Sequence, residues 1–376
     1  MFERKLLRNL DFRVLALALL FTLVGVAVID SATATFPGGS APYVQRQLLA
    51  AGIGLVVMIL FAIIDYSDFQ RWAKLFYFGH LALLAAVLVA GVESRGSTRW
   101  LQLGSIPVPQ PSELAKISLI IALAAFISHR EQSEWSWGDM AQGFLFVVPS
   151  ATLVLLQPDL GTSIIFFALA AGMMYVAGVA GTRLLGLAVL GLGTISAALY
   201  AHLNLGFKIP LHEHQVQRLT SFLQPDVDPL GTAYQLIQSV IAIGSGRLWG
   251  KGLFGGTQNV LRFIPDKHTD FIFSVVGEEL GFVGTSLIVF LFVAFMWLCL
   301  SIAMRARDRF GALLVIGVVS MWASTFFINA GMTVGIMPVT GLPLPFLSYG
   351  GSALIANFAA LGLVLNVGMR RQKILF

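Results

Sequence analysis

The chain has 376 residues, of which 57% are hydrophobic and 11% are charged, and its mean hydropathy is +0.83. This composition excludes a soluble globular domain, in which about a quarter of the residues are charged. The single cysteine, Cys299, excludes a disulfide framework and a thiolate metal site. A net charge of +5 would suggest nucleic-acid binding in a soluble protein, but here the charges are distributed as in a membrane protein.

Ten charge-poor runs are long enough to cross a membrane, because about 20 apolar residues span a hydrocarbon core of roughly 30 Å as a helix. In lipid, single runs of this length satisfy their backbone as helices. In chain order the runs are 14–29, 47–64, 75–92, 112–128, 140–158, 160–182, 184–203, 280–304, 310–330 and 350–369. They predict an all-α, polytopic membrane protein with ten transmembrane helices, in one domain over residues 1–376.

The Lys and Arg residues of the short loops divide unequally between the two sides of the membrane. Ten spans place both termini on one side, which carries Arg4, Lys5, Arg8, Arg13, Arg71, Lys74, Arg130, Arg183, Arg305, Arg307, Arg309, Arg370, Arg371 and Lys373. The short loops of the other side carry Arg46, Arg95, Arg99 and Lys116. Because positive residues accumulate in cytoplasmic loops, this asymmetry predicts cytoplasmic termini.

Two hydrophilic segments, 93–111 and 204–271, are longer than the other connections, and both fall on the extracytoplasmic side. The second joins the seventh and eighth helices. Long loops in compact proteins are usually functional or disordered. An apolar stretch at 234–243 has a helical pattern, so we expect ordered, half-buried structure within the long loop.

The region from Phe310 to Met369 contains no Asp, Glu, Lys, Arg or His. Its linker, 337–352, holds three prolines and three glycines and cannot continue a helix. Irregular backbone near membrane depth is tolerated where it is packed in protein or lines a cavity. We therefore predict a cavity-lining loop in preference to a tight hairpin.

The unusual charges gather at the extracytoplasmic ends of the spans. Four cations there suit an anionic headgroup such as a pyrophosphate-linked lipid, although contact with anionic phospholipid would need the same charges: Arg46, Lys116, Arg218 and Lys251. Glu113 lies one helical turn from Lys116, so the two residues form either a structural ion pair or a functional one. Asp159 adds a carboxylate in the turn between the fifth and sixth spans.

Asp270 stands at the end of a polar cluster that runs directly into an apolar segment. A carboxylate at a membrane edge is costly unless it has a task. Thr269 is a candidate helix N-cap, which would place Asp270 in a first helical turn, where the helix dipole favours its ionised form. An ionised carboxylate beside a cavity acts as a general base or as a metal ligand. His268 and Glu278 are either supporting residues or, respectively, a hydrogen-bonded loop histidine and an anchor of the next span.

Six motifs follow one another along most of the chain: QPSELAK at 110–116, QPDLGT at 157–162, IGSG at 243–246, HTDFIF at 268–273, GEELG at 277–281 and PLPFLSYGG at 343–351. In this order they resemble the SEDS (shape, elongation, division, sporulation) family, and residues 250–258 favour its elongation branch over its division branch. The resemblance implies a glycosyltransferase that polymerises lipid II into peptidoglycan on the outer face of the bacterial cytoplasmic membrane. It also implies a class B penicillin-binding protein as the transpeptidase partner.

The family's essential aspartate maps onto Asp270, which would remove the proton of the acceptor hydroxyl, alone or with a divalent Mg²⁺ or Mn²⁺ ion. The four cations would neutralise the leaving undecaprenyl pyrophosphate. The supporting residues would be Glu113, Asp159, His268, Thr269 and Glu278. Two other functions stay open: a lipid II flippase, which would need polar groups leading towards the cytoplasm, and a scaffold that recruits a transpeptidase, which leaves Asp270 without a task.

Overall fold

The computed structural model describes residues 9–94, 97–100, 102–103, 106–107, 109–130, 135–207, 213–223 and 232–371. Five of the cations used to predict the topology lie outside these residues: Arg4, Lys5, Arg8, Arg95 and Lys373. Parts of the two long segments, 93–111 and 204–271, lie outside them as well.

Within the described ranges, nine helices are long and apolar enough to cross a membrane: α2 (Phe12–Thr33), α3 (Ala41–Ile63), α5 (Ala73–Ala90), α6 (Pro111–Ser128), α7 (Trp137–Leu156), α9 (Gly181–Leu205), α13 (Ile272–Met304), α14 (Arg309–Thr333) and α15 (Gly351–Met369). The remaining predicted span is α8 (Leu160–Val176), whose 17 residues reach the lower limit for a crossing helix. The predicted polytopic helical fold is confirmed.

The two long segments contain short elements of their own. Residues 93–111 overlap two antiparallel strand pairs, which the sequence did not predict: β1 (Val92–Ser94) with β2 (Ser97–Trp100), and β3 (Gln102–Leu103) with β4 (Ile106–Pro107). The segment 204–271 contains α10 (Glu213–Leu223), α11 (Thr232–Ser245) and α12 (Thr257–Val260). Helix α11 covers the apolar stretch 234–243, so the expectation of ordered structure there is confirmed.

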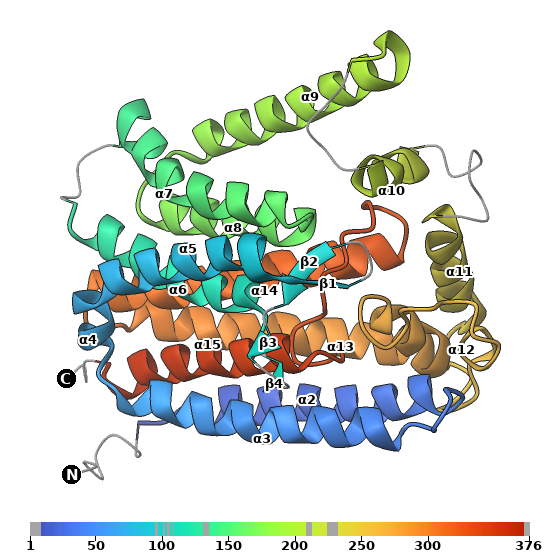
Figure 1. Ribbon diagram of the computed structural model, residues 1–376. Helices are drawn as coiled ribbons and strands as arrows, with labels where there is room; N and C mark the ends of the chain where they lie inside the picture. The colour runs from blue at the N-terminus through green and yellow to red at the C-terminus, as the bar shows by residue number, and fades with distance from the viewer. Residues whose placement is uncertain are drawn as a thin grey trace.

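The centre of the bundle is formed by α6, α14 and α15, because 78%, 67% and 83% of the residues in their apolar windows are buried inside the protein. Helix α9 stands apart from the bundle with 6% buried (Figure 1). The start of α2 and the end of α15 lie with α4 (Tyr66–Arg71) at one end of the bundle, whereas α10, α11 and α12 lie towards the other (Figure 1). The fold thus separates these three helices of the long loop from the first and last helices of the bundle.

Helix α13 is broken at Gly281, whose φ of 65° and ψ of −168° leave the helical region. The segment 247–252 fills the break, and the N–H of Phe282 donates to the carbonyl of Arg247 (2.8 Å). A Cβ atom on Gly281 would lie 2.2 Å from the backbone nitrogen of Gly250, so this contact requires glycine. The part of α13 before Gly281 is therefore held in place by the long loop.

The linker between α14 and α15 is packed inside the protein. Phe346 is 1% exposed, and its ring centroid lies 5.5 Å from that of Trp322. The Nδ2 of Asn329 in α14 donates to the carbonyl of Leu342 in the linker (2.6 Å). Since buried side chains satisfy its irregular backbone, the linker is tolerated at this depth. It also lines a cleft, as described below.

Candidate functional site

Asp270 lies in a turn directly before α13. The carbonyl of Asp266 accepts the N–H of Asp270 (3.2 Å) and also the Oγ1 of Thr269 (3.2 Å). The N-cap of α13 is Phe271, so the prediction that Thr269 caps a helix containing Asp270 is wrong. The reason is local: a closed turn around the Asp266 carbonyl ends before the helix begins. The carbonyl of Asp270 accepts from Asn329 Nδ2 (2.8 Å), which fixes the turn against α14.

The carboxylate of Asp270 and the guanidinium of Arg218 border the same small space beside Gly341. A Cβ atom on Gly341 would lie 3.3 Å from Oδ2 of Asp270 and 3.5 Å from NH1 of Arg218. Gly341 also has a φ of +72°, which an L side chain rarely adopts. Three distant segments, α10, the turn before α13 and the α14–α15 linker, therefore bring a cation and a carboxylate together.

A narrow cleft of about 10 Å³ lies beside this space, between the turn before α8, helix α10 and the linker. Its lining includes Pro158, Arg218, Pro338 and Thr340. Asp159 belongs to the same turn and is 4% exposed; its carboxylate accepts the N–H of Thr162 (3.2 Å) and the Oγ1 of Thr162 (3.0 Å). The carboxylate of Asp159 therefore caps α8 and orders one wall of the cleft.

Glu113 and Lys116 form an ion pair in the first turns of α6. Their Oε1 and Nζ atoms are 2.8 Å apart, and each side chain is 7% exposed. The N–H of Gln110, just before α6, donates to Oγ of Ser352 in α15 (3.0 Å). The pair is therefore buried at the start of α6, which the Gln110–Ser352 hydrogen bond connects to α15. The two charges neutralise each other.

Arg46 lies in a different groove. It is exposed on α3 and lines this groove together with Trp100, Tyr349 and Ser352. The groove runs along the start of α15, where the linker that carries Gly341 ends. Arg46 is therefore available to a ligand that approaches the linker from the side of α3.

Lys251 and Glu278 form a second ion pair of predicted site residues, in which the carboxylate is buried and the lysine is partly exposed. The Oε1 of Glu278 accepts from Lys251 Nζ (2.7 Å), from the N–H of Gln258 (2.9 Å) and from Thr257 Oγ1 (3.2 Å). Glu278 is 1% exposed and Lys251 is 25% exposed. The pair connects the segment 247–252 to the part of α13 that precedes Gly281.

Lys267 is completely buried three residues before Asp270. Burial, and to a lesser extent the neighbouring guanidinium of Arg262, lowers the pKa of Lys267 to about 8. The Nζ of Lys267 donates to the carbonyl of Asn259 and lies 5.2 Å from the ring centroid of Phe36. These contacts attach the turn before α13 to α12 and to the loop after α2.

His268 is enclosed by aromatic rings. Its ring centroid lies 5.3 Å from that of Phe36 and 5.4 Å from those of Tyr43 and Tyr349. Its carbonyl accepts the N–H of Tyr349 (3.0 Å). Together with the contacts of Lys267, this packing fixes the position of the segment that precedes Asp270.

Residues 8–373 match the family model described as "Cell cycle protein", which covers FtsW, RodA and SpoVE. The chain belongs to the FtsW/RodA/SpoVE family. The resemblance to the SEDS family is thereby confirmed.

Relatives within the FtsW/RodA/SpoVE family match the chain along its length. It is 37% identical over 365 residues to stage V sporulation protein E of Bacillus subtilis, covering 95% of this chain and 96% of the relative. It is 37% identical over 366 residues to the peptidoglycan glycosyltransferase MrdB of Escherichia coli K12, covering 97% and 95%. The probable peptidoglycan glycosyltransferase FtsW of Pseudomonas fluorescens is 36% identical, with 96% and 88% covered. Identity at these similar levels does not separate the branches of the family.

Solved structures of family members share the fold. The chain aligns with the rod shape determining protein RodA of Thermus thermophilus with a TM-score of 0.71 and 30% identity, covering 97% of this chain and 98% of RodA. It aligns with a chain of a peptidoglycan synthase complex with a TM-score of 0.79 and 32% identity, covering 96% and 97%. That complex is described as coordinating polymerization and crosslinking.

Gly341 and Asn329 were not anticipated as site residues. Asn329 is a fully buried polar residue in an otherwise apolar span, and such residues often mark functional sites in membrane proteins. That signal was present in the sequence. Gly341 carried no comparable signal, because its importance comes from the side chains of Asp270 and Arg218, which belong to other segments.

The described residues include no group of three or more His, Cys, Asp or Glu side chains that would hold a metal ion by themselves. Asp270 offers one carboxylate beside the cleft. Mg²⁺ is usually bound in proteins through one or two carboxylates together with substrate phosphates. A divalent cation at Asp270 would therefore need further oxygen ligands from a bound phosphate.

Proposed function

We propose that this chain is a peptidoglycan glycosyltransferase that polymerises lipid II, with Asp270 as the general base. Membership of the FtsW/RodA/SpoVE family and the activity named for its relatives support the enzyme class. The observation that supports the site assignment is the approach of Asp270 and Arg218 to Gly341, where a carboxylate suited to accept a proton lies beside a guanidinium suited to bind phosphate.

In the proposed reaction, the 4-hydroxyl of an acceptor GlcNAc attacks C1 of a donor MurNAc. The new C1–O4 bond forms as the bond from C1 to the pyrophosphate oxygen breaks, with inversion from α to β. Asp270 accepts the hydroxyl proton, and undecaprenyl pyrophosphate leaves with both bonding electrons. Arg218 stabilises the charge that develops on the pyrophosphate. Arg46, on the neighbouring groove, binds an outlying part of the anionic substrate.

The two ion pairs, Glu113–Lys116 and Glu278–Lys251, have a supporting role in this proposal. Lys116 and Lys251 already neutralise Glu113 and Glu278, so they position helix starts and the long loop more than they contact phosphate. Asp159 orders the cleft wall by capping α8. A divalent cation held by Asp270 and the substrate phosphates would supply additional charge neutralisation.

The remaining parts of the proposal are the orientation in the membrane, the branch of the family and the protein partner. We place both termini in the cytoplasm and Asp270 on the extracytoplasmic face of the bacterial inner membrane, which the positive-inside asymmetry supports. We assign the chain to the elongation branch, acting in rod-shape maintenance. Its partner would be a class B penicillin-binding protein, in keeping with the structural likeness to a chain of a peptidoglycan synthase complex.

The test uses the purified full-length protein with the cognate transpeptidase and labelled lipid II, with glycan products separated on gels. We expect Asp270→Asn to lower polymerisation by about 10²–10⁴-fold, the usual contribution of general-base catalysis. Asp266→Asn, a carboxylate change in the same turn, serves as the matched control and should retain polymerase activity. Omission and re-addition of Mg²⁺ or Mn²⁺ tests the metal.

Glycan ladders that persist at the parental rate with Asp270→Asn would overturn the assignment of the base. A lipid II translocation assay in proteoliposomes separates the rival functions. Transport without polymerisation would establish the flippase instead. Neither activity in the presence of a functional transpeptidase would favour the scaffold.

A further inference from the structure

Another groove lies at the end of the bundle where α4 meets α5. It is formed by α4, α5, α6 and α7, and its volume is about 840 Å³, within the roughly 300–1,000 Å³ typical of ligand pockets. Its floor contains the buried small residues Ala73, Ala122 and Ala125, which let the groove sink between α5 and α6. The site proposed for catalysis does not use this groove.

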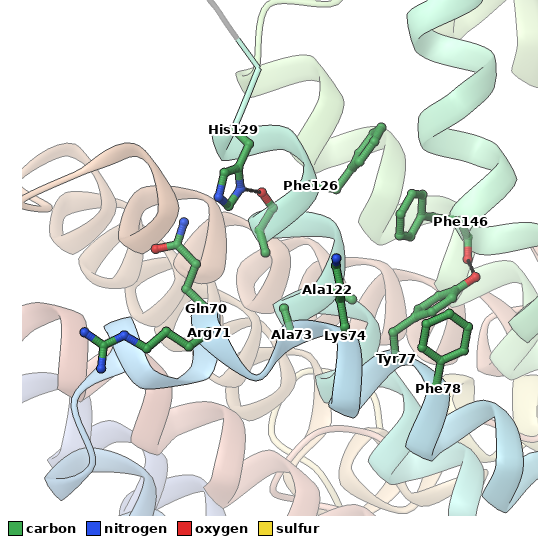
Figure 2. A pocket seen from close by; sticks show the side chains of 11 residues that line it. Gln70, Arg71, Ala73, Lys74, Tyr77, Phe78, Ala122, Phe126, His129 and Phe146 are labelled. Carbon is green, nitrogen blue, oxygen red and sulfur yellow. Dashed lines mark hydrogen bonds between the residues drawn. The ribbon is translucent and has the colours of Figure 1, made fainter.

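The polar side chains of this groove gather at one end. Figure 2 shows Gln70, Arg71 and His129 at that end, and Lys74 extending between α5 and α6. Arg71 pairs with Asp68 (3.2 Å) at an exposed position, whereas Lys74 makes no ion pair with any residue that the structure describes. Trp72, 51% exposed, lies beside these cations, as aromatic residues do at the level of lipid headgroups.

The other end of the groove is lined by aromatic side chains, and the Tyr77 hydroxyl there is hydrogen-bonded within the protein. The ring centroid of Phe146 lies 5.1 Å from that of Tyr77 and 4.5 Å from that of Phe126. The hydroxyl of Tyr77 donates to the carbonyl of Phe146 (3.0 Å), so this wall presents apolar surface to a ligand (Figure 2). A ligand that fits must therefore be anionic at one end and apolar at the other.

We propose that this groove is a binding site for one anionic diacyl phospholipid. Lys74, with Arg71 and His129 beside it, binds the phosphate, and the acyl chain lies over the alanine floor against Tyr77 and Phe126. Basic pockets between transmembrane helices bind anionic headgroups in this manner. The phospholipid would brace α5 against α6, the helix that carries Glu113 and Lys116.

The experiment is native mass spectrometry of the full-length protein with equimolar phosphatidylglycerol and phosphatidylethanolamine of identical acyl chains. We expect one phosphatidylglycerol to be retained preferentially. Lys74→Gln should weaken that binding roughly fivefold, the equivalent of about 1 kcal/mol for one basic residue near a lipid surface. Arg305→Gln removes an exposed cation after α13, outside the groove, and should leave the binding unchanged.

A second arm tests the acyl chain and does not depend on the headgroup. Phosphatidylglycerol with a photoreactive acyl chain should crosslink to α5 and α6, and Ala125→Phe, which fills the floor, should reduce that crosslinking. Equal retention of the two lipids, equal effects of Lys74→Gln and Arg305→Gln, or crosslinks confined to other helices would overturn the proposal. Asp270→Asn should bind the lipid normally, so this test and that of the polymerase fail independently.

Discussion

Lys251 Nζ lies 2.7 Å from Glu278 Oε1 and joins the long loop to the broken start of α13. The sequence presented Lys251 as one of four equivalent cations for a pyrophosphate. The structure distinguishes among them. Lys251 and Lys116 pair with Glu278 and Glu113, whereas Arg218 lies near the Asp270 carboxylate at Gly341 and Arg46 is exposed in a groove. Stability and activity should therefore respond differently to their removal.

We expect Lys251→Met to lower the free energy of unfolding by roughly 2–3 kcal/mol, because it leaves the buried Glu278 carboxylate without its cation. The double variant Lys251→Met/Glu278→Gln should recover part of that loss. Arg218→Gln should act chiefly on catalysis, with a polymerase rate about 10²-fold lower. Thermal melts and glycan synthesis on the same preparations check both. A stable Lys251→Met protein with no activity would contradict the structural role.

Gly341→Ala should reduce polymerisation about 10- to 100-fold, because its Cβ atom would push on the Asp270 carboxylate and the Arg218 guanidinium, and small misplacements of catalytic groups are costly. Gly335→Ala is the matched control. Gly335 has a similar φ of +82° and lies just after α14, before the linker, but a Cβ atom there would meet only Val240 within 4 Å. Both variants should lose similar stability. Equal activity losses would show that backbone strain alone explains the effect.

The Glu113–Lys116 pair can be tested as a structural unit. Lys116→Met should destabilise the protein by about 3–5 kcal/mol, since it strands a buried carboxylate, and Glu113→Leu/Lys116→Met should restore most of that stability. Melting temperatures of the single and double variants provide the measurement. If the stable double variant also synthesises glycan, the pair is structural; if it is stable but inactive, Lys116 or Glu113 takes part in the reaction.

Lys267 predicts a pH dependence of stability. Its pKa is about 8 in the folded protein, below the value of 10.5 for a free lysine, so between these values the unfolded state binds more protons. Stability should therefore rise as the pH increases from 8 towards 10.5, by about 1–3 kcal/mol at most from this group. Lys267→Met should remove this contribution. Melting curves of both proteins across that range decide the point, and parallel pH profiles would refute it.

The ten spans could be predicted from sequence because a membrane helix must be apolar over its whole length and satisfy its own backbone, whatever its neighbours are. The predicted runs agree with the helices to within a few residues at most ends, as in 112–128 against Pro111–Ser128. The start of α13 differed most, since the prediction began at 280 and the helix begins at Ile272. There the chain carries Glu278 and Glu279, whose charges are buried only because residues from the long loop and α2 contact them.

Hydropathy and a carboxylate at a membrane edge are local properties, so the membrane class, the number of spans and the interest of Asp270 could be read from the amino-acid sequence. The cation that lies near Asp270 could not, because Arg218 approaches it at Gly341 only in the folded chain. Whether a lysine contacts a carboxylate or borders a cleft depends on segments far apart in the chain, and Gly341 matters only because α10 and the turn before α13 converge on it.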